Sequence, residues 1–504
     1  GHSDWRTLET DTDWEKLAFN EDSKTRMVDF NASGGNDRTR FYLSGAYMNQ
    51  DGILVGNNFK RISARINLDH DATNKLKIGF SLGLTRSLGN RVSYDNDFST
   101  PIQLVALSPV TPVRDLNGNL YDRPVATYYN GLIELENASY LSTIYRNLGS
   151  AYLNYKFTKN LVFKTEFGVD LQNQSDDQYF GSRTINGEAT NGYGQFDGFK
   201  AFTYNTNNYF NYTRNAGKHD LDFTLGMSFQ KLSVDESRIT GEDFPDDDLQ
   251  TLASAGRITG GYTEKEDYSI LSYFARANYK FDNKYLFAAS GRIDGSSVFG
   301  VNNRYGFFPS VSAGWIISEE NFLNTSKLIS FLKIRASYGT SGSDGVANRF
   351  ASRTTYGSAK HNNTSGLATS QLGNPDLKWE RSKQLDIGLD FGLWNNRLSG
   401  EIDYYTRNTD DLFYNVPLPG TTGFASWLVN IGSMKNTGFE LVLNSVNVNN
   451  KSFKWNTSVN ISKMKNEITK LDGDQTIIPG NDGRYLNSLL VGQPIGVFYG
   501  PKFA

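Results

Sequence analysis

The chain has 504 residues, a formal net charge of -3 and no cysteine. The absence of cysteine excludes disulfides and thiolate metal sites, and the small net charge gives no indication of nucleic-acid binding. No apolar run approaches the ~18 residues that a membrane-spanning helix needs. These features leave a membrane β-barrel open, because only one face of each barrel strand is apolar.

Apolar and polar residues alternate in segment after segment. In chain order, the clearest cases are 61–69 (RISARINLD), 76–84 (LKIGFSLGL), 220–229 (DLDFTLGMSF), 385–393 (LDIGLDFGL) and 453–462 (FKWNTSVNIS). Because successive side chains of a strand point to opposite faces, this pattern predicts strands with one apolar face. We predict about fifteen strands of roughly 10–14 residues, longer than the soluble average of about 5–6 and sufficient for the about 9–11 of a membrane strand.

The segments that connect the predicted strands alternate in length. Short polar turns are expected near Lys159, Gly217, Asn283, Asn395 and Asn449. The connections between them show no periodic pattern and cover about 87–146, 175–200, 231–267, 341–378 and 411–433. One longer link on the short side, 318–331, is expected to contain a brief helical turn. Alternating short turns and long loops are typical of outer-membrane barrels.

This alternation of connections decides which environment the apolar face should meet. In 385–393, Leu385, Ile387 and Leu389 share one face, whereas Asp386 and Asp390 share the other. We predict that the apolar face meets lipid. The reverse orientation would place the charged face of many strands in lipid, where an Arg or Lys costs up to ~2–4 kcal/mol at the membrane midplane and an Asp or Glu somewhat less. The alternative is a soluble β protein whose apolar face is covered by a core.

Several stretches of the chain, taken in order, resemble one known family. They are GRIDGSSVFG (291–300), SVSAGWIISEENF (310–322), IRASYGTSGSDG (334–345), GNPDLKWERSKQLDIGLDFGL (373–393) and VGQPIGVFYG (491–500). Together they resemble the barrel of SusC/RagA-type TonB-dependent outer-membrane transporters, over about residues 13–504. Within them, Asn374, Pro375, Leu377 and Glu380 resemble a motif of TonB-dependent receptors more widely, and Trp379 resembles its SusC-type form.

The resemblance implies an all-β fold, a large antiparallel transmembrane barrel of about 22 strands. It also implies import of oligosaccharides or peptides across the outer membrane, a SusD-like surface lipoprotein as lid, and energy from the TonB complex through an N-terminal part. Residues 1–36 would be the junction after a plug and the barrel entry, and 37–504 a barrel incomplete at its C-terminus. The plug and the N-terminal accessory domain are not recognisable in the sequence, so we expect 1–504 to be a fragment.

Aromatic residues in the long connections are the candidate ligand-binding residues, because flat rings can stack on sugars or hold peptide side chains. They are Tyr128, Tyr129, Tyr193, Phe413, Tyr414 and Trp427. Packing within the loops is the alternative for each of them. Two further aromatic residues, Trp379 and Trp394, bracket the 380–393 strand and would suit aromatic girdles at two membrane surfaces, with packing in a core as the alternative.

Residues that could carry chemistry are few. The acidic stretch 241–250 makes Asp243, Asp246 and Asp248 weak candidates for a structural calcium ion, with a solvated loop as the alternative. No other cofactor is expected, and no G-x-S-x-G elbow supports a hydrolase, so we predict that the protein is not an enzyme. Besides the importer, a siderophore or vitamin receptor and a non-transporting surface or adhesion barrel remain as alternatives.

Overall fold

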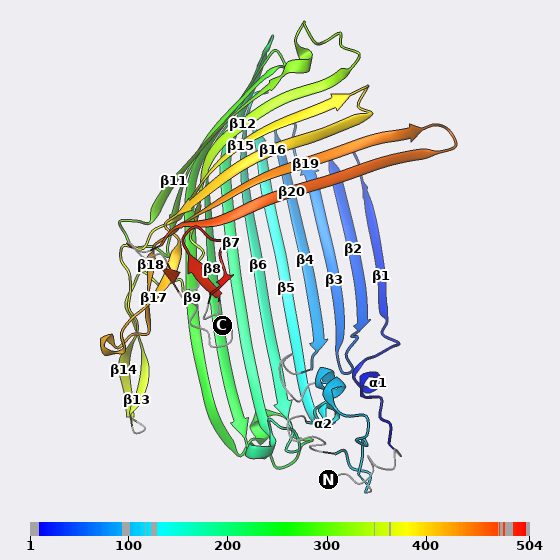
Figure 1. The fold of residues 1–504 in the computed structure, drawn as a ribbon, viewed down its shortest axis with the longest axis vertical. Coiled ribbons are helices and arrows are strands. Elements are labelled where there is room, and N and C mark those ends of the chain that lie inside the picture. The colour runs from blue at the N-terminus through cyan, green and yellow to red at the C-terminus, as the bar shows by residue number, and fades with distance from the viewer. Residues whose placement is uncertain are drawn as a thin grey trace, which may run out of the picture. The chain divides into compact units, whose positions relative to one another are not determined.

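The computed structural model describes residues 10–92, 101–115, 117–121, 129–346, 348–361, 364–471, 473, 477–478 and 487–499. Sixteen strands form one antiparallel sheet in which they pair in chain order, except that β15 follows β12 and β19 follows β16 (Figure 1). The all-β prediction is confirmed, and the strand number is close to the expected one. Among the described residues, no helix has the length and apolar character needed to cross a membrane.

The strands of the main sheet share this antiparallel pairing. They are β1 (Thr25–Gly35), β2 (Thr39–Asp51), β3 (Asn58–Asp71), β4 (Leu76–Asn90), β5 (Ala138–Lys156), β6 (Leu161–Phe180), β7 (Tyr193–Ala216), β8 (His219–Glu242), β9 (Arg257–Phe281), β10 (Tyr285–Ser296), β11 (Tyr305–Ile316), β12 (Ile329–Ser343), β15 (Glu380–Leu393), β16 (Leu398–Asp410), β19 (Ser433–Asn449) and β20 (Lys454–Lys470).

The remaining elements are short and lie in the connections. They are the helices α1 (Trp14–Ala18) and α2 (Gly131–Asn137), the 3-10 turns η2 (Pro101–Ala106), η3 (Glu188–Thr190), η4 (Leu252–Ser254), η5 (Ile317–Glu319) and η6 (Gly420–Thr422), the hairpins β13 (Thr355–His361) with β14 (Thr364–Gln371) and β17 (Phe413–Pro417) with β18 (Ser426–Asn430), and the strands β21 (Ile477–Ile478), β22 (Asn487–Leu490) and β23 (Val497–Phe498). The turn η5 confirms the helical turn predicted within 318–331.

The alternating sequence produces a sheet with two different faces. Phe41, Leu68 and Phe80 lie opposite one another in β2, β3 and β4, and their side chains are 41%, 40% and 44% exposed. On the other face of β3 and β4, the Ser81 hydroxyl donates to Asn67 Oδ1 at 2.7 Å. Neighbouring strands in register therefore align apolar side chains on one face and polar pairs on the other.

Strand β15 shows the same division. Leu385 and Ile387 are 37% and 45% exposed, whereas Gly388 is buried on the opposite face. Asp390, on the same face as Gly388, accepts a hydrogen bond from Arg335 Nε at 2.9 Å. The predicted separation of apolar and polar side chains in 385–393 is confirmed.

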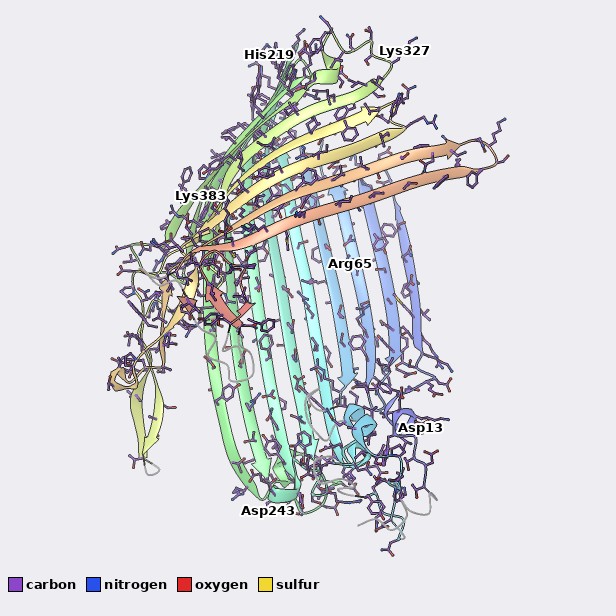
Figure 2. All side chains as sticks on the ribbon, in the orientation of Figure 1. Asp13, Arg65, His219, Asp243, Lys327 and Lys383 are labelled. Atoms are coloured by element: carbon purple, nitrogen blue, oxygen red, sulfur yellow. The ribbon has the colours of Figure 1, made fainter. Side chains whose placement is uncertain are left out.

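The chain divides into two compact units. The first comprises 1–154, 166–206 and 231–267, and the second comprises 155–165, 207–230 and 268–504. In the first unit, a small core forms where α1 meets η2, with Trp14, Ala18, Leu104 and Leu107 buried. The side chain of Asp13 caps α1 by accepting from the backbone N–H of Lys16 at 3.0 Å (Figure 2).

The second unit has its own apolar core, built from segments that follow or precede strands. Its buried residues are Val298, Phe299, Phe308, Ala351, Leu377 and Trp379. The Trp379 ring lies 5.2 Å from Phe299 and 5.3 Å from Phe308, and only 4% of the residue is exposed. The girdle prediction is therefore wrong for Trp379, because its ring is buried in a core of loop residues and does not face a membrane surface. Trp394 is 52% exposed in the turn after β15.

All five long connections contain more regular structure than predicted. In 87–146, β4 extends to Asn90, and η2, α2 and the start of β5 follow. In the predicted loop 175–200, β6 continues to Phe180 and β7 begins at Tyr193. In the predicted loop 231–267, β8 continues to Glu242 and β9 begins at Arg257. Residues such as SVDESRITGE (233–242) are polar on both faces, so the hydrophobic alternation ends while the backbone ladder continues. The connections 341–378 and 411–433 are not structureless either, since each contains a hairpin.

Candidate functional site: a polar groove and a seated hairpin

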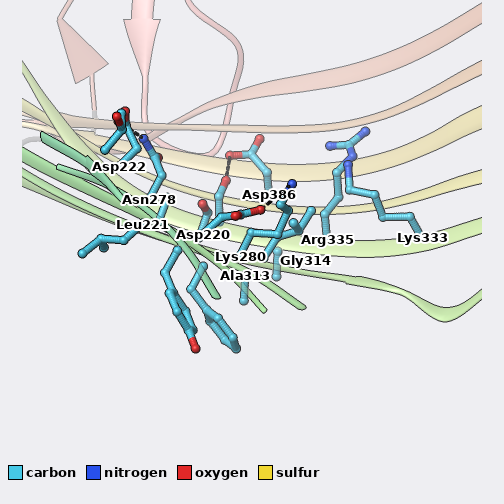
Figure 3. Close-up of a pocket in the computed structure, with 18 of the residues that line it drawn as sticks. Asp220, Leu221, Asp222, Asn278, Lys280, Ala313, Gly314, Lys333, Arg335 and Asp386 are labelled. Carbon is cyan, nitrogen blue, oxygen red and sulfur yellow. Dashed lines mark hydrogen bonds and ion pairs between the residues drawn. The ribbon is translucent and has the colours of Figure 1, made fainter. Parts of the chain in front are cut away.

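A groove lies in the second unit along β8 to β12 and β15. It includes a cavity of about 480 Å³ (Figure 3). Part of its lining is small: Ala288 lies opposite Ser312, and Gly314 lies opposite Leu286, in the paired strands β10 and β11. Small side chains leave the space above the backbone unfilled, which accounts for the depression.

Charged and amide side chains of β8 and β9 form one wall of this groove. Lys280 Nζ lies 3.0 Å from Asp220 Oδ2. Asn278 Nδ2 donates to Asp222 Oδ1 at 3.3 Å. Each carboxylate on this wall therefore has a partner within the protein.

The other wall comes from β12 and β15, where Lys333, Arg335 and Asp386 line the cavity, and Arg335 also reaches a carboxylate on β16. Arg335 Nε lies 2.9 Å from Asp390 Oδ1, and Arg335 Nη1 lies 2.8 Å from Asp403 Oδ1. Lys333 Nζ is 3.1 Å from Asp390 Oδ2. These pairs neutralise one another, so the wall is highly polar without a strong excess of either sign.

The groove continues along the strands. A second cavity of about 360 Å³ shares Ala288, Ser312, Ser337 and Asp386 with the first. Asp386 accepts from Ser337 Oγ at 3.3 Å and from Gln384 Nε2 at 2.9 Å. Hydroxyl, amide and paired ionic groups can exchange hydrogen bonds with water or with a polar solute.

Three of the six candidate ligand residues lie together on the hairpin β17–β18. Tyr414 pairs with Val429 and Trp427 pairs with Val416, which places Tyr414 and Trp427 on one face. Phe413 lies on the opposite face, where its ring stacks 6.3 Å from Phe299 at the core of the second unit. Packing thus accounts for the position of Phe413, whereas the other two rings are half-buried on the far face.

The other candidate aromatic residues belong to the first unit. Tyr193 lies at the start of β7, with its ring 6.3 Å from Phe180 and its hydroxyl donating to Gln195 Oε1 at 2.9 Å. Tyr129 is half-buried just before α2. Tyr128 lies outside the described residues.

The motif residues 374–380 lie beside the hairpin. Asn374 and Leu377 are buried, the latter completely. Trp379 Nε1 donates to the carbonyl of Arg304 at 3.0 Å. A side chain added at Gly300 would collide with the carbonyl oxygen of Pro375, so this contact requires a glycine. Pro375 precedes β15 by several residues, and the strand itself begins at Glu380.

The acidic loop is organised around Asp247, which the sequence did not single out. Asp247 Oδ1 accepts from the Tyr179 hydroxyl at 2.8 Å and from the backbone N–H of Ser182 at 2.8 Å. Burial works to raise the pKa of Asp247, but these hydrogen bonds outweigh it and hold the pKa below the usual range for Asp.

The calcium candidates have different roles in this loop. Asp243 follows the end of β8 in a left-handed conformation, with φ of 64° (Figure 2). Asp246 Oδ1 accepts from the backbone N–H of Asp248 at 2.9 Å. No group of three or more His, Asp or Glu side chains among the described residues is arranged to hold a metal ion. Calcium at Asp243, Asp246 and Asp248 stays a prediction.

The charged groove walls are the feature that sequence reasoning missed. Their signal was present, since Asp220, Asp222, Asp386 and Asp390 all occupy polar positions of alternating strands. Which of them lie near Lys280, Lys333 and Arg335 depends on strand register, and a single sequence does not specify that register.

A long antiparallel sheet with one exposed apolar face and one polar, grooved face defines a membrane-barrel type of protein. Residues 92–494 match the family described as TonB dependent receptor-like, beta-barrel. The chain belongs to this family.

Individual relatives agree. TonB-dependent receptor P3 of Formosa agariphila is 31% identical, with 98% of this chain and 51% of that protein covered. TonB-dependent receptor SusC of Bacteroides thetaiotaomicron is 28% identical, with 94% of this chain and 49% of that protein covered. The chain thus spans about half the length of these curated relatives. They are named as receptors, not as enzymes.

A solved structure gives the same result. The chain is similar to a structure of the RagAB peptide transporter with a TM-score of 0.87 and 28% identity, covering 97% of this chain and 55% of that chain. The resemblance to the SusC/RagA type that the motifs indicated is confirmed, and so is the barrel fold.

Proposed function

We propose that this chain forms barrel wall in an active importer of the outer membrane, of SusC/RagA type, that takes up oligosaccharides or peptides. The observation that carries the proposal is the two-faced sheet, supported by the similarity to SusC and to the RagAB peptide transporter. A SusD-like lipoprotein would cover the outer side, and the TonB complex would supply energy from the periplasm. We place the protein in the outer membrane on the same grounds.

The exposed apolar face supports placement in lipid. Phe41, Leu68, Phe80 and Ile387 are each at least 40% exposed within regular strands. Water would make such a continuous face unfavourable by about 25 cal/mol for each Å² of apolar surface. Hydrocarbon removes this cost and requires in return that backbone groups are paired inside the protein, as they are in strand ladders.

The polar groove supports a role as transport wall. Its ion pairs, such as Arg335 with Asp390 and Asp403, are partnered within the wall and leave no strong excess of one charge. A wall of this kind offers weak and replaceable hydrogen bonds, which suit a hydrated oligosaccharide or peptide that must move on. A ferric siderophore or a vitamin remains the second candidate, because the same family architecture can serve it.

Growth experiments test the substrate class. A strain that lacks the gene should lose growth on particular glycans or peptides as sole nutrient and should regain it when the gene is restored. Growth under iron limitation serves as the matched control and should be unchanged. A defect confined to iron limitation would reverse the assignment to a siderophore receptor.

Purification from native membranes tests the partner. In mild detergent, a tagged copy should bring down a surface lipoprotein at a ratio near one to one. Recovery of the barrel protein without any lipoprotein would contradict the proposed lid. An unrelated porin tagged in the same way controls for nonspecific capture.

A further inference from the structure

The hairpin β17–β18 is attached to the main sheet in an unusual way. It lies between β16 and β19 in the chain but forms a separate two-stranded sheet. Two backbone hydrogen bonds at its base, from the Ile431 N–H to the Leu412 carbonyl at 2.8 Å and from the Leu412 N–H to the Gly432 carbonyl at 3.4 Å, join it to the end of the β16–β19 pair. At its base, Asp411 has φ of 60° and Gly432 has φ of 84°, so the backbone changes direction at both ends of the hairpin. The regular pairing of β16 with β19 is therefore interrupted at this base, and contacts beyond the base help to fix the position of the hairpin.

Side chains supply further contacts with segment 373–380, among them a 3.4 Å hydrogen bond from Trp427 Nε1 to the Gly373 carbonyl and a 3.0 Å ion pair between Lys378 Nζ and Asp411 Oδ1. Asn374 Nδ2 donates to the carbonyl of Leu428 at 2.9 Å. Asn430 Oδ1 accepts from the backbone N–H of Lys378 at 2.9 Å, and Asn430 Nδ2 donates to the Lys378 carbonyl at 2.8 Å. Glu380 Oε1 accepts from the backbone N–H of Phe413 at 2.7 Å.

These hydrogen bonds use the backbone of one segment and the side chains of the other. Asn374 and Glu380 reach from the motif segment to the backbone of the hairpin, and Asn430 reaches back from the hairpin. An amide side chain can donate and accept at once, which is how Asn430 holds both backbone groups of Lys378. On one face of the hairpin, Phe413 and Leu428 pack against the core of the second unit.

We propose that Asn374, Glu380 and Asn430 form a clasp that seats the hairpin on segment 374–380, and that Asp411 and Gly432 are the hinge on which the hairpin swings when the clasp is released. The seated position fixes the opposite face, which carries Tyr414 and Trp427. The motif residues are thus positioning residues for a movable flap. This inference concerns motion only and does not depend on which substrate the protein imports.

The absence of cysteine in the chain allows a direct test. Cysteines introduced at Thr422, in the exposed turn of the hairpin, and at Lys383, exposed on β15, would carry two spin labels. Electron-electron distance measurements on the full-length protein in native membranes report whether the hairpin occupies one position. The parent protein should give a single narrow distance distribution.

Paired variants separate the clasp from general stability. Glu380→Gln keeps an oxygen that accepts from Phe413, so it should keep the narrow distribution, whereas Glu380→Ala should broaden it or add a second distance. Asn374→Asp and Asn430→Asp keep the acceptor oxygen and lose the donor, so each should also broaden it. Heat-modifiable migration on gels checks that each variant is folded.

Two outcomes would overturn the proposal. The first is a narrow, unshifted distribution in folded Glu380→Ala, Asn374→Asp and Asn430→Asp. The second is equal broadening in Glu380→Gln and Glu380→Ala, which would show that the negative charge, not the acceptor to Phe413, holds the hairpin. If one variant fails to fold, the other two still decide between these results.

Discussion

Replacement of Ile387 by Arg tests the orientation of the whole sheet. Ile387 lies near the middle of β15, is 45% exposed and belongs to the apolar face. If this face meets hydrocarbon, an Arg there costs about 2–4 kcal/mol at the midplane. Since each 1.4 kcal/mol is a factor of ten, the ratio of folded to unfolded protein should fall by about 30-fold to 1,000-fold.

The matched control places the same side chain on the polar face of the same strand. Gln384 is suitable because it lines the groove and its Nε2 already donates to Asp386, so an Arg at this position gains a carboxylate partner. Gly388 is not suitable. A Cβ added there would lie 2.5 Å from Arg335 Cζ and 2.6 Å from Asp403 Oδ1, so a collision would obscure the effect of lipid.

Urea titration of the protein in membrane vesicles measures the loss, and heat-modifiable migration on gels confirms assembly. Ile387→Arg should lower the unfolding midpoint strongly, and Gln384→Arg should lower it little. Equal losses for the two variants would refute the assignment of the apolar face to lipid, because a charge in hydrocarbon must cost more than the same charge beside a carboxylate on the polar face.

Three further predictions follow from single contacts. Asp247 has a lowered pKa in the folded state, so its stabilising effect is present above the ordinary Asp pKa and is lost as the pH falls through the lowered value. The protection factor of the amides in 241–250, which is the intrinsic exchange rate at each pH divided by the observed rate, should fall on acidification in the parent and should change less in Asp247→Asn. Trp379→Ala removes a buried ring and should lower the free energy of unfolding by about 3–5 kcal/mol in a denaturant titration, with exposed Trp394→Ala as a control that changes little. Gly300→Ala should cost about 1–3 kcal/mol in the same titration because the added carbon meets the Pro375 carbonyl, and an unchanged midpoint would contradict this contact.

The parts of the fold that could be predicted from sequence are those governed by local alternation. In 385–393, spacing alone identifies the strand and both of its faces, because side-chain direction has a period of two. The pattern fails in 233–242, where the strand β8 continues with polar residues on both sides. A strand with polar side chains on both faces has no hydrophobic periodicity, so it can be recognised only from its backbone pairing with neighbouring strands.

The candidate site was predicted less completely, for a related reason. Tyr414 and Trp427 were identified as loop aromatics, but their shared face depends on the pairing of β17 with β18. Phe413 is also aromatic, but it lies on the opposite face of the hairpin, which packs against the core. Composition can nominate an aromatic ring, whereas the register of a short hairpin decides whether that ring is available.

The residues 374–380 show how one short motif can serve several long-range contacts. Leu377 and Trp379 are buried in the core, Asn374 and Glu380 bind the backbone of a hairpin more than thirty residues away, and β15 begins at Glu380. The girdle prediction for Trp379 used only its separation from Trp394 along the strand, so it did not include the loop residues that bury Trp379. Because Glu380 both starts a wall strand and seats the hairpin, we expect a change in hairpin position to act on the start of β15. This connection places the motif between the movable part of the molecule and its wall.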